Sequence, residues 1–267
     1  MNLMKNWTDI SHLDFRVVLL FEEIQLHWLL QYKSKEHLGI LLNEYPDVLW
    51  YIQHKAPEIA DQAIAIAQTY KPNTESVDIK KIERDFLSSM IDWVIYVTDP
   101  NAYDQLSFNA WDTDELLNIT PFRDKLVVDI GSGTGSQAFR VTPFVKTLFC
   151  VEPVGNLRKY LYKKASDRNT SNFFVVDGLI TNIPFPNDFA DIVMGGHVFG
   201  DYPEEEFAEM YRVVKQGGTL ILMPGNNDVD NDIHEFLLQK GMNWDRFLEP
   251  GPDFGHGWKR KYWKKKI

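Results

Sequence analysis

Five short, almost entirely apolar runs place the strongest limit on what this chain can fold into. Each run is three to five residues long, and enough chain separates successive runs for a crossover helix. Runs of this kind are typical of strands that are buried on both faces of a parallel sheet. We therefore predict an α/β fold with a doubly wound sheet and right-handed crossovers. The predicted strands are 126–130, 148–151, 173–176, 192–194 and 220–223.

The chain ahead of these runs is predicted to be helical throughout. Apolar residues recur every three or four positions over 13–28, behind a capping signal at Ser11, which predicts one amphipathic helix. A longer helix is predicted over about 77–97, before an Asp-Pro pair that ends it. We expect an all-helical N-terminal extension over 1–111 and an α/β domain over 112–267.

The C-terminal end of the chain is predicted to add two strands, near 243–249 and 258–264, one of them antiparallel. The last nine residues carry six basic side chains, although the whole chain has a net charge of −10. We interpret these charges as protection of an exposed edge strand against pairing with a neighbour. The acidic remainder of the chain disfavours a nucleic-acid partner.

Composition indicates a reducing, cytoplasmic environment. The chain has one cysteine, Cys150, which cannot form an internal disulfide or a cysteine-based metal cage. No apolar run approaches the roughly 20 residues that a membrane-spanning helix needs. The N-terminus lacks the basic start and the cleavage site of a secretory signal. We expect no metal site and no membrane insertion, and the oligomeric state stays open.

A glycine-rich turn after the first predicted strand is the candidate ligand-binding motif. Residues 129–135 read D-I-G-S-G-T-G, with glycine at every second position behind an acid. Glycine suits a turn that needs unusual backbone dihedrals and lets a ligand approach the main chain. A helix after the turn would aim unpaired N–H groups at that ligand. The dinucleotide fingerprint G-x-G-x-x-G would need glycine where the chain has Ser136.

This spacing resembles motif I of the class I S-adenosylmethionine-dependent methyltransferases, of the type 11 small-molecule kind. Further features follow in the order of that family. Glu152 ends the second predicted strand and Asp177 ends the third. Residues 183–193 and 211–222 are similar to the passages that lead into the family's fourth and fifth strands. The resemblance is strong over about 112–223, looser over 224–267, and does not reach 1–100.

The resemblance implies a Rossmann-like sheet and S-adenosylmethionine as cofactor, with S-adenosylhomocysteine as product. It implies that the glycine turn and Asp129 hold the methionine end, that Glu152 holds the ribose, and that Asp177 holds the adenine. Pro143 is expected to end the first crossover helix early. The cofactor-binding residues that we expect are Asp129, Gly131, Ser132, Gly133, Gly135, Glu152, Pro153, Asp177, Gly178, Leu179 and Gly195.

The expected activity is methyl transfer to a small-molecule acceptor by in-line displacement. His197, after the fourth predicted strand, is the candidate general base, and His256 is a second histidine that could reach a substrate. We expect the helical extension to act as a lid over the acceptor site. Two alternatives remain: a non-catalytic regulatory module that binds S-adenosylmethionine, and an NAD-dependent oxidoreductase, which the glycine spacing disfavours.

Overall fold

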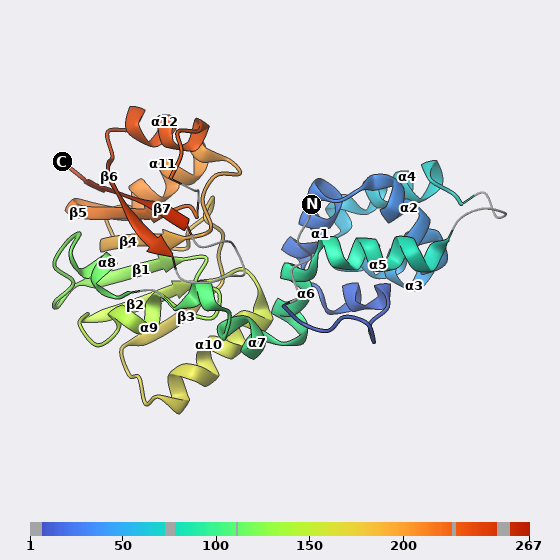
Figure 1. The fold of residues 1–267 in the computed structure, drawn as a ribbon, viewed down its shortest axis with the longest axis horizontal. Coiled ribbons are helices and arrows are strands. Elements are labelled where there is room, and N and C mark those ends of the chain that lie inside the picture. The colour runs from blue at the N-terminus through green and yellow to red at the C-terminus, as the bar shows by residue number, and fades with distance from the viewer. Residues whose placement is uncertain (1–6, 73–77, 111, 226–227, 250–256) are drawn as a thin grey trace. The chain divides into compact units, whose positions relative to one another are not determined.

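The computed structural model describes residues 7–72, 78–110, 112–225, 228–249 and 257–267 (Figure 1). The chain divides into two compact units, Met1–Tyr103 and Asp104–Ile267. Residues 104–110 therefore belong with the α/β unit and not with the helical extension in which we placed them. The Asp104 carboxylate binds Lys164 Nζ at 2.6 Å, which anchors this segment to the second unit. None of the helices in these ranges is long and apolar enough to cross a membrane.

The first unit consists of short helices, blue to green in Figure 1. Its core is formed by buried apolar side chains from η1, η2 and α1 to α6. Prolines begin η2 and α3, because a proline in the first turn has no N–H group to leave unpaired. In the described residues the elements are η1 (Phe15–Leu20), α1 (Glu23–Tyr32), α2 (Lys35–Glu44), α3 (Pro46–Lys55), η2 (Pro57–Ile59), α4 (Ala60–Thr69), α5 (Ile79–Ser89), α6 (Ile91–Thr98) and α7 (Pro100–Asp104), the last of which spans the boundary.

Two helices that we predicted as continuous are each interrupted. The helix expected over 13–28 is η1 followed by α1, because Phe21 between them is extended, with ψ of 143°. The carbonyl of Phe21 accepts a hydrogen bond from the Tyr51 hydroxyl at 2.8 Å instead of a helical N–H. The helix expected over 77–97 is α5 followed by α6, with buried Met90 at the junction. Apolar spacing continues through both breaks because the segments on either side face one core.

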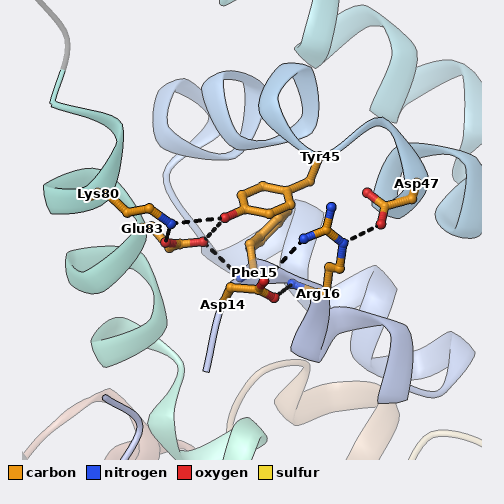
Figure 2. A network of polar contacts seen from close by, with 7 residues as sticks. All are labelled: Asp14, Phe15, Arg16, Tyr45, Asp47, Lys80 and Glu83. Carbon is orange, nitrogen blue, oxygen red and sulfur yellow. Dashed lines mark hydrogen bonds and ion pairs between the residues drawn. The ribbon is translucent and has the colours of Figure 1, made fainter. Parts of the chain in front are cut away.

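A buried carboxylate joins three segments of the helical unit (Figure 2). Glu83 of α5 accepts hydrogen bonds from the Phe15 N–H in η1, at 3.0 Å, and from the hydroxyl of Tyr45, which follows α2. The Nζ of Lys80 lies 2.9 Å from its other oxygen. Burial raises the pKa of the Glu83 carboxyl, but the donors from Tyr45, Lys80 and Phe15 outweigh it, so this pKa lies below its ordinary value.

The second unit is built on a sheet whose strands match the predicted runs. Strands β1 to β5 are parallel, and β7 runs antiparallel to both of its neighbours, β5 and β6. The order across the sheet is β3-β2-β1-β4-β5-β7-β6. The predicted doubly wound sheet with one antiparallel strand is thus confirmed. Within the described ranges the strands are β1 (Leu126–Ile130), β2 (Thr147–Val151), β3 (Phe173–Val176), β4 (Ala190–Gly196), β5 (Val214–Met223), β6 (Asn243–Glu249) and β7 (Gly257–Lys265).

Helices cover both faces of this sheet. Successive strand residues point to opposite faces, so Val127 belongs to one core, with α8, α9 and α10, whereas Val128 belongs to the other, with α11 and α12. This two-sided burial explains why the strands read as continuous apolar runs. Before β1 lie η3 (Ser107–Asn109) and α8 (Asp114–Leu117), and between the strands lie α9 (Ala138–Val141), α10 (Gly155–Asp167), α11 (Pro203–Val213) and α12 (Asp232–Gln239).

The basic C-terminal strand lies inside the sheet and not at its edge. β7 pairs with β5 on one side and β6 on the other. Three of its basic residues, Lys259, Arg260 and Lys261, are buried beside acids. Arg260 Nε lies 2.8 Å from Asp228, and Lys261 Nζ lies 2.5 Å from Glu115. Our interpretation of these charges as edge protection is therefore wrong. They form ion pairs that connect β7 to the chain around it.

Replacing Glu83 by Ala should destabilise the helical unit by about 2–4 kcal/mol, because the Phe15 N–H and the Tyr45 hydroxyl would lose their buried partner. Urea denaturation followed by tryptophan fluorescence measures this change. Asp47→Ala is the matched control, since Asp47 pairs with Arg16 at the surface (Figure 2), and its loss should barely move the midpoint. Equal midpoints for the two variants would show that Glu83 does not join these segments.

Candidate functional site

The turn between β1 and α9 has the backbone conformation that its glycines allow. Gly131, Gly133 and Gly135 have φ angles of 64°, 56° and 81°, in the left-handed region. The Gly131 N–H donates to the Val151 carbonyl at 2.8 Å, which ties the turn to the end of β2. A Cβ on Gly131 would lie 2.5 Å from Val198, so the turn also packs too closely against the loop after β4 for a side chain there.

The helix after the turn is short. We expected it near Gly135, and the Phe139 N–H does donate to the Gly135 carbonyl at 2.9 Å, but regular α-helix begins only at Ala138. It ends at Val141, two residues before Pro143, so the early end predicted from this proline is confirmed. The turn itself, and not a long helix after it, therefore forms most of this segment.

Glu152 directly follows β2 and faces the turn with a buried carboxylate. Its Oε2 accepts a hydrogen bond from the Gly133 N–H at 2.8 Å, and its Oε1 accepts one from the Val154 N–H at 2.9 Å. Val154 precedes α10, so one side chain connects the glycine turn to the start of that helix. A carboxylate offers about four lone-pair positions, which leaves each oxygen able to accept one more hydrogen bond.

Asp129, within β1, is a second buried carboxylate at this place. Burial raises the pKa of its carboxyl to about 7, the hydroxyl of Ser132 lowers it, and the charge of Glu152 raises it further. Burial also raises the pKa of Glu152 to about 7, against the lowering effect of the Val154 and Gly133 N–H groups. A ligand that brings positive charge or hydrogen-bond donors would favour the charged form of both groups.

The residues predicted to face adenine lie one strand further along the sheet edge. Asp177 directly follows β3; its side chain is 71% exposed and its carboxylate lies 2.9 Å from Arg158 Nη1. Arg158, on α10, also donates to the carbonyls of Glu152 and Pro153, at 2.8 and 2.7 Å. This arginine therefore connects the ends of β2 and β3. The same loop continues with Gly178 and Leu179.

The end of β4 carries the predicted general base. After Gly195 and Gly196, His197 has a φ of 57°, which is uncommon for a residue with a side chain. Its Nε2 lies 2.6 Å from Oε1 of Glu249, a 3% exposed residue at the end of β6. A Cβ on Gly225 would lie 2.4 Å from its Nδ1, so the imidazole packs directly over that glycine. Strained backbone of this kind concentrates at functional sites.

The loop after His197 is held by another buried acid. Glu206 of α11 accepts hydrogen bonds from the N–H groups of Gly200, at 2.7 Å, and Tyr202, at 2.9 Å. Burial raises the pKa of this carboxyl, which the two N–H donors oppose. The chain that leaves β4 is thus fixed by backbone contacts before any ligand binds.

Three buried polar atoms from the turn through α9 have no hydrogen-bond partner among the residues that the structure describes: Thr134 Oγ1, Gln137 Oε1 and Arg140 Nε. Gln137 precedes α9 and is 7% exposed. A Cβ on Gly196 would lie 1.8 Å from its Nε2, so the amide lies directly against the end of β4. An unsatisfied buried group costs about 1–3 kcal/mol. A bound ligand is one physical reason for keeping such a group.

The structure brings most of the predicted residues to one edge of the sheet. Asp129, the glycine turn and Glu152 lie at the carboxyl ends of β1 and β2, Asp177 lies at that of β3, and Gly195 at that of β4. β2 and β3 lie on one side of β1, and β4 and β5 lie on the other, so the direction of strand order reverses at β1. Ligands of doubly wound sheets bind at this switch point. His256 lies outside the described residues.

Sequence reasoning missed three residues of this region: Gln137, Arg158 and Glu249. Gln137 offered a signal, since a polar side chain two positions after the last glycine of the turn falls at the switch point. Glu249 offered none, because it is 52 positions from His197 and belongs to no motif. Arg158 lies on a helix whose polar residues alternate with apolar ones, as on any surface helix.

In the part of the chain that the structure describes, one group of side chains is close enough to hold a metal ion: Glu23, His27 and Glu58 of the helical unit. His27 Nε2 already forms a hydrogen bond with Glu58, at 2.5 Å, near the surface. This group lies in the other unit from the glycine turn.

Part of the α/β unit is similar to known proteins. Residues 128–222 match the sequence model of a family described as methyltransferase domain. An uncharacterized methyltransferase, YcgJ of Bacillus subtilis, is 28% identical over 114 residues, which are 42% of this chain and 45% of that protein. The chain thus spans less than half the length of this relative.

Two other relatives are similar at comparable levels. A demethylmenaquinone methyltransferase of Geobacillus is 25% identical over 118 residues, 42% of this chain and 50% of that protein. A polyamine aminopropyltransferase of Streptococcus uberis is 25% identical over 202 residues, 70% of each chain. Among solved structures, a SAM-dependent methyltransferase of Aquifex aeolicus superposes with a TM-score of 0.49 at 17% identity, over 63% of this chain and 99% of that one.

The buried carboxyl of Asp129 should make stability depend on pH. Its pKa is about 7 in the folded chain and about 4 in the unfolded chain, so the folded state holds the proton more tightly. The extra stability of the folded state that this tighter proton binding provides is complete below about pH 4, and it is lost as the pH rises through 7. Asp129→Asn cannot ionise, so its free energy of unfolding relative to the original protein should increase from pH 4 to pH 8. Urea denaturation at several pH values measures this difference, and a constant difference would contradict the raised pKa.

Proposed function

We propose that this protein is a class I methyltransferase, an enzyme that binds S-adenosylmethionine and transfers its methyl group to a small-molecule acceptor. The match of residues 128–222 to the methyltransferase domain and the strand order of the sheet support this proposal. The observation that carries the proposal is the convergence of the left-handed glycine turn with two buried carboxylates at the switch point of the sheet. Demethylmenaquinone, which the name of one relative gives as its substrate, is a small molecule, and this supports an acceptor of that class.

The residues present fit this cofactor. The turn has no lysine of its own for a phosphate, and the cofactor has no phosphate but does carry a sulfonium and an ammonium. Asp129 and Glu152 offer the negative charge that such a ligand requires, and each oxygen of Glu152 can accept one ribose hydroxyl. Asp177 would accept from the adenine amino group, with Pro153, Gly178 and Leu179 beside the ring. The remaining proposed contacts are those of Gly131, Ser132, Gly133, Gly135 and Gly195.

The mechanism that we propose is in-line displacement. The cofactor supplies a methyl group on a sulfonium, which is already a good leaving group. The task of the protein is therefore to hold the acceptor in line, and positioning of this kind contributes roughly 7–11 kcal/mol. Glu206 and the backbone around Gly200 fix the loop that borders this position.

His197 is the residue that we propose as general base for the acceptor. Glu249 accepts a hydrogen bond from its Nε2, which selects the tautomer whose Nδ1 takes a proton. The buried carboxylate also stabilises the imidazolium that this proton transfer creates. Lys259, 3.9 Å from the other oxygen of Glu249, balances the charge of that carboxylate.

Two further parts of the chain concern the acceptor: the helical unit, as a predicted cover, and the basic strand β7, through its charges. That residues 1–111 cover the acceptor site remains a prediction from the sequence. The buried basic residues of β7, Lys259, Arg260 and Lys261, are already paired with acids of this chain, which supports a small molecule over a nucleic acid as acceptor. Residence in the cytoplasm also remains part of this proposal.

Calorimetric titration tests the proposal directly. S-adenosylmethionine should bind and NADH should not, because the turn lacks the dinucleotide spacing. Gly133→Ala should lower the affinity at least tenfold, since its φ of 56° disfavours a side chain and its N–H positions Glu152. Gly241→Ala, with a φ of 74° in the turn before β6, is the matched control for backbone strain and should bind normally. A wild-type chain that does not take up the cofactor would refute the proposal.

Turnover separates an enzyme from a binding module. Transfer of a labelled methyl group to a panel of metabolites identifies the acceptor. With that acceptor, His197→Ala should lower turnover about 10²–10⁴-fold, the usual contribution of a general base, while affinity for S-adenosylhomocysteine changes little. His54→Ala, on the exposed side of α3, should leave both unchanged. Unchanged turnover in His197→Ala would leave positioning alone as the source of catalysis.

A further inference from the structure

The geometry points to Gln137 as the residue that recognises the ammonium group of the cofactor's amino-acid end. This inference rests on the proposed function and adds a specific contact to it. It starts from an unpaired atom: Gln137 Oε1 is buried and has no hydrogen-bond partner within the described ranges. The glutamine belongs to neither the glycine motif nor the acids that follow it.

The order of the strands places the amino-acid end of the cofactor near this side chain. In the proposed pose Asp177 at β3 faces the adenine, and Glu152 at β2 faces the ribose. The sheet order is β3-β2-β1-β4, so a ligand that continues along the same edge reaches the ends of β1 and β4 next. Its amino-acid end therefore lies at the switch point between these two strands.

Gln137 spans this switch point. Its backbone follows the turn that leaves β1, and its amide lies against Gly196 at the end of β4, where a Cβ would come within 1.8 Å of Nε2. The amide can occupy this position only because residue 196 is a glycine and has no Cβ. With 7% of its surface exposed, Gln137 is not a solvated side chain that water satisfies from outside.

The hydrogen-bonding capacity of Oε1 determines which group of the cofactor it can bind. An amide oxygen accepts hydrogen bonds and cannot donate them. The amino-acid end of the cofactor carries a sulfonium, a carboxylate and an ammonium, and only the ammonium has N–H groups to donate. A charge-assisted hydrogen bond from this ammonium would satisfy the buried oxygen.

This assignment predicts opposite effects on binding and on stability. In the free protein the unpaired oxygen is a cost, so an apolar side chain of similar length should not destabilise the fold. In the complex the same change removes a hydrogen bond. A glutamine with a merely structural role would show the reverse pattern, with lower stability and unaltered binding.

The test is Gln137→Met in the full-length chain, studied by calorimetry and thermal denaturation. Affinity for S-adenosylhomocysteine should fall about tenfold, whereas affinity for 5′-methylthioadenosine, which lacks the amino-acid end, should change less than twofold. The melting temperature of the free protein should stay the same or rise. Equal losses for the two ligands, no loss for either, or a lower melting temperature would each overturn the assignment.

A third ligand identifies the group that Gln137 binds. The decarboxylated analogue of S-adenosylhomocysteine keeps the amine and lacks the carboxylate. Gln137→Met should weaken its binding about tenfold as well. If the substitution leaves this analogue unaffected, the carboxylate is the partner and the ammonium assignment is wrong.

Gln25→Met is the matched control. Gln25 is also buried, but its Oε1 accepts from the Glu22 N–H at 3.1 Å and its Nε2 donates to the Trp93 carbonyl. This variant should lose stability and bind S-adenosylhomocysteine normally. Failure of the wild-type chain to bind any of the three ligands would refute the proposed function itself, whereas normal binding by Gln137→Met refutes only the role of Gln137.

Discussion

The geometry of the candidate site depends on the hydrogen bonds that the carboxylate of Glu152 accepts. This carboxylate lies directly after β2, accepts the N–H of Gly133 from the turn after β1, and accepts the N–H of Val154 at the start of α10. A turn with three left-handed glycines has little conformational preference of its own, because glycine restricts the backbone less than any other residue. The buried acid supplies that restriction. It does so at the energetic cost of desolvation, which its raised pKa reflects.

Several groups around this turn are buried, unpaired or in an uncommon backbone conformation. Asp129 and Glu152 are two acids buried near one another, Gln137 leaves an amide oxygen unpaired, and His197 has a left-handed backbone. Each of these features costs free energy in the unliganded chain. The large two-sided core of the sheet stabilises the unit sufficiently to tolerate them. Their collection at one edge of the sheet supports the binding site that we propose there.

Buried charged side chains have different kinds of partner in the two units. In the helical unit, Glu83 joins segments that are far apart in sequence through a tyrosine, a lysine and a backbone N–H. In the α/β unit, Arg260 and Lys261 of β7 meet acids from a loop and from α8. A buried ion pair gains little stability over an apolar pair of the same shape, but removing one partner is costly. Such pairs therefore define which segments lie together more than they strengthen the fold.

The sequence alone determined the sheet and the position of the turn. Strands buried on both faces must be apolar at every position, and a left-handed turn must use glycine, so both leave local signals that need no knowledge of the rest of the chain. Residues 126–130 and 173–176 were predicted with the bounds that the structure shows. The breaks at Phe21 and Met90 were not, because apolar spacing reports the face that a residue presents and not the continuity of its helix.

Only the tertiary structure decided what lies beside the turn. That Glu249 reaches His197, that Gln137 lies against Gly196, and that the basic strand is interior all depend on the order in which strands pair across the sheet. Pairing order is a long-range property: it brings together residues dozens of positions apart whose types carry no local mark of the contact. Periodicity and turn chemistry act over a few residues, and for this reason they could predict the elements but not these neighbours.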